Sequence, residues 1–172
     1  MRFVVTGEWT KNRLLKLIVL FFLFFVVAFT LTMSLLFFNK MGLSYESIVT
    51  YYLGSEEKYI PARTYQGLLE ISHYHLFAMA ILMMTLTHLL LFVPMSLGLK
   101  AFFVIVAFSS AFLNEASSWL IRFVNPNFAY LKIVSFVVLN FTILLLVYCT
   151  LKALLKNEPS AYMEGNKKGT SK

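Results

Sequence analysis

Histidine is the side chain best suited to binding metals or moving protons near neutral pH, and every histidine of this chain lies in one apolar segment, residues 70–94. The three are His73, His75 and His88, and Glu70 precedes the first of them by three positions. The segment is long enough to cross a bilayer as a helix. Ionisable side chains inside a membrane helix are costly and usually face a partner, a cofactor or water. These four residues are therefore the first candidates for a functional site.

A helical wheel divides these residues into two groups. At about 100° per residue, Glu70, His73 and His88 fall on one face of the helix, whereas His75 points to a different side. His88 is separated from the other two histidines by roughly 20–22 Å along the helix axis. The segment therefore places several ionisable residues near one end and a single histidine near the other.

The overall composition is that of a membrane protein. Of the 172 residues, 59% are hydrophobic and only 13% are charged, and the mean hydropathy is +0.76. Four apolar runs have the length of a membrane span. The sequence therefore predicts an all-α fold, an integral membrane four-helix bundle formed by residues 17–155. Residues 1–16 are expected to be a cytoplasmic N-terminal segment and residues 156–172 a polar, disordered cytoplasmic tail.

The expected spans are joined by connections of very different length. The predicted spans are residues 17–38, 70–94, 101–123 and 132–155. A tight turn joins the second span to the third, so these two helices are expected to be antiparallel neighbours. Residues 39–67 form a long outer loop rich in tyrosine, with a helical turn over 46–53 at the membrane interface. The tyrosines are typical of an aromatic belt, and a docking surface for a soluble partner is the alternative.

Charge and cysteine content restrict the topology and the function. Ten of the 15 Lys and Arg residues fall on the side that would hold both termini, and five fall on the other side. The positive-inside rule then predicts both termini in the cytoplasm and a multi-pass protein of the bacterial inner membrane. The net charge of +7 is explained by this topology, and no nucleic acid partner is expected. Cys149 is the only cysteine, which excludes an internal disulfide and a CxxC site.

This topology places a set of polar side chains near the outer membrane surface, because the second and third spans run in opposite directions. The set consists of Glu70, His73, His75, Asn114, Glu115 and Arg122. We expect these residues to converge on one site, with Glu70 close to Glu115. A buried carboxylate must be neutralised or paired, so Arg122 or a histidine is the expected partner. His88 would lie alone near the inner surface.

Bound haem would suit this arrangement. Imidazole is a common axial ligand of b-type haem, and histidines about 20 Å apart on one membrane helix suit two haems stacked across a bilayer. The chain resembles the membrane-anchor and cytochrome b subunits of respiratory enzymes. The resemblance lies in His73 or His75 together with His88, in the number of helices and in size. The resemblance implies a small subunit of an electron-transfer assembly with b-type haem or quinone on this helix. It also implies other membrane or periplasmic redox subunits, or a homodimer, as partners.

The source of a second haem ligand is left open. Cytochrome b subunits take the second haem ligand from a histidine on another helix, but the other predicted spans of this chain contain no histidine. A second copy, another subunit or a methionine would have to supply it, and the candidate methionines are Met33, Met79, Met83 and Met84. A quinone needs no such ligand, because histidine and glutamate near a membrane surface can bind its head group and relay protons.

Two further interpretations remain. Glu70 and His73 have the carboxylate–histidine spacing of di-iron bundles, and a single zinc, copper or iron ion could be held by Glu70, His73 or His75, and Glu115. Alternatively, the polar residues only hold the helices together in a non-catalytic membrane subunit or assembly factor. Ser72 points to a different face from His73, and no Ser–His–acid pattern indicates hydrolysis.

Overall fold

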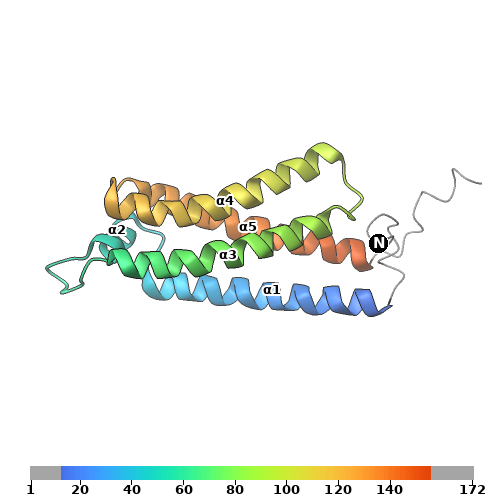
Figure 1. Ribbon diagram of the computed structural model, residues 1–172, viewed down its shortest axis with the longest axis horizontal. Helices are drawn as coiled ribbons and strands as arrows, with labels where there is room; N and C mark the ends of the chain where they lie inside the picture. Colours follow the sequence, from blue (N-terminus) through green and yellow to red (C-terminus); the bar gives the residue numbers. More distant parts are fainter. Residues whose placement is uncertain (1–12, 156–172) are drawn as a thin grey trace, which may run out of the picture.

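The computed structural model describes residues 13–155, and this part of the chain is almost entirely helical (Figure 1). The helices are α1 (Arg13–Lys40), α2 (Tyr45–Leu53), α3 (Tyr65–Leu90), α4 (Leu97–Phe123) and α5 (Phe128–Leu155). Within the described range, extended pairing is limited to an isolated bridge between Ser55 and Ile60. The predicted N-terminal segment as far as residue 12, and the predicted tail at 156–172, lie outside the described residues.

Four of these helices form the membrane-spanning bundle. Helices α1, α3, α4 and α5 are 26–28 residues long and apolar enough to cross a membrane. They lie side by side along the long axis of the molecule, and α2 sits at one end, which we call the α2 end (Figure 1). The predicted all-α membrane fold with four spans is confirmed, as is the short helix in the first long connection.

Each of the four long helices begins before the apolar run that predicted it. α3 begins at Tyr65, because the Thr64 side chain caps its first turn. α5 begins at Phe128 rather than at residue 132, so Lys132 lies a full turn inside the helix. The predicted starts were too late because apolar length marks the hydrocarbon-spanning part, whereas capping groups decide where a helix begins. α3 also ends at Leu90, before the predicted end at residue 94.

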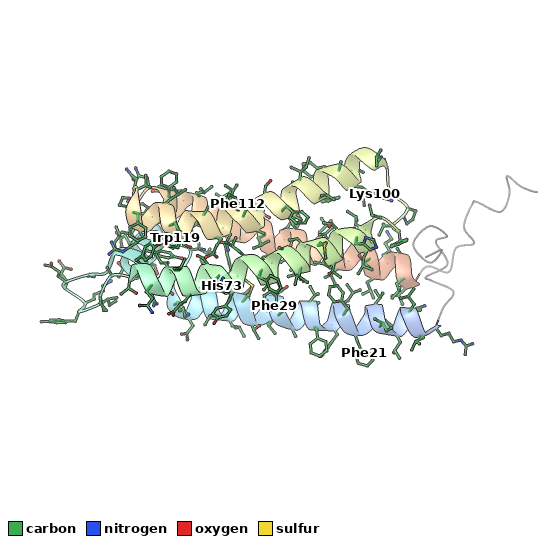
Figure 2. All side chains as sticks on the ribbon, viewed as in Figure 1. Phe21, Phe29, His73, Lys100, Phe112 and Trp119 are labelled. Atoms are coloured by element: carbon green, nitrogen blue, oxygen red, sulfur yellow. The ribbon has the colours of Figure 1, made fainter. Side chains whose placement is uncertain are left out.

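Apolar side chains cover much of the outer surface of the bundle. Phe21, Phe24 and Phe25 of α1 are 59%, 66% and 67% exposed. Figure 2 shows Phe21 pointing away from the neighbouring helices. Such exposure would be unfavourable in water, whereas lipid chains solvate it without cost. The outward phenylalanines therefore support a lipid-facing surface.

The interior changes character along the bundle. Far from α2 the core is apolar, with Leu86 and Leu146 fully buried. α4 and α5 are the most closely packed pair, and α4 buries Ser110, Ser117 and Ser118. Small residues let membrane helices approach closely, and their hydroxyls bond within and between helices. This serine-rich face of α4 leads into the polar interior of the α2 end.

Helix α1 is attached to α5. Ser34 Oγ donates a hydrogen bond of 3.1 Å to Asn140 Oδ1. One turn further along, the rings of Phe37 and Phe136 stack with centroids 3.7 Å apart. α1 packs closely against α5 but not against α3. This arrangement leaves room between α1 and α3 at the α2 end.

The short helix α2 closes that end of the bundle. The Ser44 side chain caps its start, and Ile48 and Tyr52 are buried against the long helices. Gly54 ends the helix with φ 84°, a left-handed conformation that favours glycine. The chain can turn back sharply at this point toward the start of α3.

Candidate functional site

A carboxylate is buried near the α2 end of the bundle. Glu115 of α4 is only 8% exposed. Its Oε1 accepts a hydrogen bond of 2.6 Å from Ser72 Oγ, and its Oε2 lies 3.3 Å from His75 Nδ1. Ser72 and His75 are about one turn apart on α3, so both face α4. A histidine was one of the expected partners of Glu115, and that prediction is confirmed.

Ser72 links this carboxylate to a tryptophan. Trp119 Nε1 donates a hydrogen bond of 2.7 Å to Ser72 Oγ, so the Ser72 hydroxyl hydrogen is directed to Glu115. Trp119 lies at the α2 end of the molecule (Figure 2). Hydrogen bonds in such a chain strengthen one another. Sequence reasoning missed Ser72, although its one-turn spacing from His75 was a usable signal.

A lysine is buried beside the carboxylate. Lys132 of α5 is 5% exposed, and its Nζ donates to Asn114 O at 2.6 Å and to Ser118 Oγ at 3.1 Å. Tyr52 OH lies 2.9 Å from the same Ser118 Oγ. Lys132 and Glu115 also attract each other electrostatically. The predicted span 132–155 placed Lys132 at the very start of its helix, whereas α5 begins a turn earlier, at Phe128, and turns this side chain inward.

A cavity of about 320 Å³ lies among these residues. All five helices and the connection before α3 contribute to its lining. The basic lining residues are Lys40, Arg63 and Lys132, and Glu115 is acidic. Apolar side chains, including Phe37 of α1 and Ile71 of α3, form much of the remaining wall. Mixed polar and apolar pockets of this size commonly bind small ligands.

A second cavity, of about 140 Å³, lies between α3 and α4. It shares His75, Asn114 and Glu115 with the larger cavity, and its other lining residues are apolar. Asn114 Oδ1 is buried and accepts no hydrogen bond from the part of the chain that the structure describes. A buried acceptor without a donor is costly, and each such group in a native protein calls for an explanation. Asn114 is therefore a candidate contact for a bound molecule.

Two arginines hold the connection that borders the cavity. Arg122 Nε donates a hydrogen bond of 2.7 Å to the backbone oxygen of Arg63, whose own N–H donates to Tyr52 O at 3.0 Å. The Arg63 guanidinium carbon lies 4.1 Å from the centroid of the Tyr51 ring. Arg122 therefore positions Arg63. It is not the partner of Glu115, so the predicted pairing of Arg122 with Glu115 is wrong.

The two tyrosines of α2 that line the cavity are uncharged at neutral pH. Burial raises the pKa of Tyr52 far above its ordinary value. Burial also raises the pKa of Tyr51, although the nearby Arg63 opposes part of this effect. Both phenols therefore keep their protons.

The structure does not bring the remaining predicted site residues into the cavity. Glu70, His73 and His88 share one face of α3, as the helical wheel predicted, but all three are exposed. The Glu70 carboxylate accepts a hydrogen bond of 3.0 Å from Gln66 Nε2. The expected approach of Glu70 to Glu115 is therefore wrong, because α3 turns a different face, which includes Ser72, toward its neighbours.

The metal site expected from Glu70, the histidines and Glu115 does not fit one copy of the chain. Between residues 13 and 155 no group of three or more His, Cys, Asp or Glu side chains could hold a metal ion. Glu70 and His73 lie on the exposed face, whereas Glu115 is buried. Cofactor binding by His73, His75 and His88 stays a prediction.

Comparison with known proteins agrees with the membrane fold. The model of a family described as a transmembrane helical domain matches residues 42–161, which include α2, α3, α4 and α5. No match was found among curated proteins or among solved structures. The family match supports a helical membrane protein and gives no support to the expected resemblance to cytochrome b subunits. The matched segment makes up more than half of the chain, and the chain therefore belongs to this family of transmembrane helical domains.

Proposed function

We propose that this multi-pass membrane protein binds a lipid-soluble ligand and holds its head group in the 320 Å³ cavity at the α2 end. The observation that carries the proposal is the lining of this cavity. The Lys132 ammonium offers a hydrogen-bond donor, and Asn114 offers a buried acceptor that lacks a donor within residues 13–155. Ligand pockets typically combine a few such polar groups with apolar walls.

The position of the cavity favours an amphipathic ligand over a water-soluble one. The cavity lies between α1 and α3, which are not closely packed against each other. Its α1 wall includes Met33 and Phe37, and its α3 wall includes Leu68 and Ile71. An apolar tail would therefore leave the site between these two helices and enter the lipid.

A quinone is one ligand of this kind, and it would make the protein a small subunit of an electron-transfer assembly. One of its carbonyl oxygens would accept a hydrogen bond from Lys132, and His75 with Glu115 would exchange protons beside it. In this proposal the protein lies in a bacterial inner membrane with both termini in the cytoplasm. The α2 end then faces outward.

Filling the cavity tests the proposal. Ile71→Trp places a large side chain at the cavity wall, and Leu82→Trp makes the same kind of change at a half-buried position of α3 outside both cavities. We expect the wild-type protein and Leu82→Trp to co-purify with the same lipid-soluble molecule. We expect Ile71→Trp to retain about tenfold less, a loss of about 1.4 kcal/mol in binding free energy. The measurement is solvent extraction of the purified proteins followed by mass spectrometry. The same extract from all three proteins would contradict the proposal.

A second candidate is b-type haem shared with a neighbouring subunit or a second copy. The observation that favours it is the exposure of His73 and His88 on one outward face of α3. Their rings contact Tyr74 and Phe92 of their own segment, which leaves the outer side open to a partner. Haem would supply one-electron chemistry, and each of these two histidines would hold a separate haem.

Optical spectroscopy tests the haem proposal. The reduced-minus-oxidised spectrum of mildly purified protein should show a b-type haem band. We expect His88→Ala to lower this band by about half if the two histidines hold separate haems. Thr85→Ala, a change one turn away on α3, should leave the band unchanged. A wild-type spectrum without a haem band would rule this candidate out.

A further inference from the structure

The basic residues of the main cavity lie at increasing depth. Lys40 at the end of α1 is exposed, Arg63 is half-buried and Lys132 is buried. Among the described lining residues Glu115 is the only acidic one. The lining is therefore positively charged overall, and the innermost positive charge is the most shielded from solvent.

Two of these cations have donors that no residue between 13 and 155 accepts from. A lysine ammonium has three N–H donors, and the described residues accept from two of those of Lys132, at Asn114 O and Ser118 Oγ. The Arg63 guanidinium stacks on Tyr51 and donates no hydrogen bond to any residue between 13 and 155. Partly buried cations with unused donors favour an anionic partner, because charge-assisted hydrogen bonds are the strongest available to them.

Glu115 is not the anionic partner of these cations. Its two carboxylate oxygens are already paired with Ser72 Oγ and His75 Nδ1 on the α3 side. It attracts Lys132, but it leaves Arg63 and Lys40 without a carboxylate partner in the part of the chain that the structure describes. These positive charges would therefore stabilise a second anion bound in the cavity.

From these contacts we propose that the ligand of this cavity is a lipid with an anionic phosphate head group that also carries a hydroxyl. The inference rests on the proposed function and names the chemical class of its ligand. The planar guanidinium of Arg63 matches phosphate oxygens, and the Lys132 ammonium lies deeper as a point charge. A hydroxyl of the head group supplies the hydrogen bond that Asn114 Oδ1 lacks within the described chain. The apolar tail passes between α1 and α3.

Lipid competition tests this inference. The full-length protein in a neutral detergent is mixed with equal amounts of phosphatidylglycerol and phosphatidylcholine with identical tails, and bound lipid is read by native mass spectrometry. We expect phosphatidylglycerol to be preferred. Arg63→Gln should reduce that preference about tenfold, because it removes a charge-assisted contact. Lys58→Gln removes the same charge from the exposed loop at the same end, outside the cavity lining, and should leave the preference unchanged.

Two further probes separate the possible failures. Decylubiquinone binding without a preference for phosphatidylglycerol would overturn the anionic head group and leave the proposed function standing. Binding of neither lipid nor decylubiquinone would overturn both. If inorganic phosphate raises the thermal midpoint of the wild type but not of Arg63→Gln, the cavity recognises phosphate. If this occurs without a preference for phosphatidylglycerol, the bound phosphate does not come from a lipid, and the inference is overturned. Equal lipid preference in Arg63→Gln and Lys58→Gln would also overturn the inference.

Discussion

Replacing Lys132 with methionine should lower the free energy of unfolding by about 3–5 kcal/mol, the usual cost of leaving a buried charge without its partner. The substitution keeps a long unbranched side chain but removes the ammonium that bonds to Asn114 O and Ser118 Oγ. It also leaves Glu115 buried without the positive charge that attracts it. The measurement is unfolding in mixed micelles, followed by circular dichroism.

A matched change on the same helix gives the control. Lys152 of α5 is exposed and lies 5.9 Å from the centroid of the Tyr148 ring, so Lys152→Met should cost less than about 1 kcal/mol. In the double variant Glu115→Gln, Lys132→Met both charges are gone, and we expect part of the lost stability to return. Strict additivity of the two changes would show that these residues do not interact. Equal costs at positions 132 and 152 would contradict the burial of Lys132.

Replacing Gly54 with alanine should lower the free energy of unfolding by about 3 kcal/mol. Gly54 has φ 84° and ψ 179°, a combination that is open essentially to glycine alone. A Cβ at this position would lie 2.6 Å from Ile60 O and 2.8 Å from Ala62 N. These are backbone atoms, so the turn that returns the chain from α2 to Arg63 would have to move. Thermal unfolding of the detergent-solubilised protein measures the effect.

Gly98→Ala is the control for this prediction. A Cβ at Gly98 would meet no atom within 4 Å, and Gly98 lies in the first turn of α4. Because alanine favours the helix over glycine, this change should be neutral or should stabilise by about 0.5–1 kcal/mol. If both glycine variants unfold at the same midpoint, the turn at Gly54 does not have the described conformation.

The sequence by itself determined the number of membrane helices and their approximate positions. A bilayer requires about 20 apolar residues for each span, so the length of an apolar run is nearly sufficient to assign one. The short loop between α3 and α4 made them neighbours, and this proximity led to the expected pairing of Glu115 with a histidine. The short helix α2 also followed from local sequence.

Only the tertiary structure decided which face of α3 points into the helix bundle. Glu70, His73 and His75 were all expected to converge with Glu115 on one site, yet of these three only His75 lies against Glu115, and Ser72 joins it. Both faces of such a helix are largely apolar, so hydropathy does not fix its rotation. Close packing against neighbouring helices and a few interhelical hydrogen bonds fix it.

The burial of Lys132 and the main cavity were likewise beyond sequence reasoning. A lysine near a helix end in a membrane protein usually reaches the interface, and only the earlier start of α5 and its packing against α4 turn Lys132 inward. The cavity joins Lys40, Arg63 and Lys132, which belong to three segments far apart in the chain. Their proximity depends on how α1, α3 and α5 pack, because side chains from distant segments share a site only after the helices have taken their positions around one another.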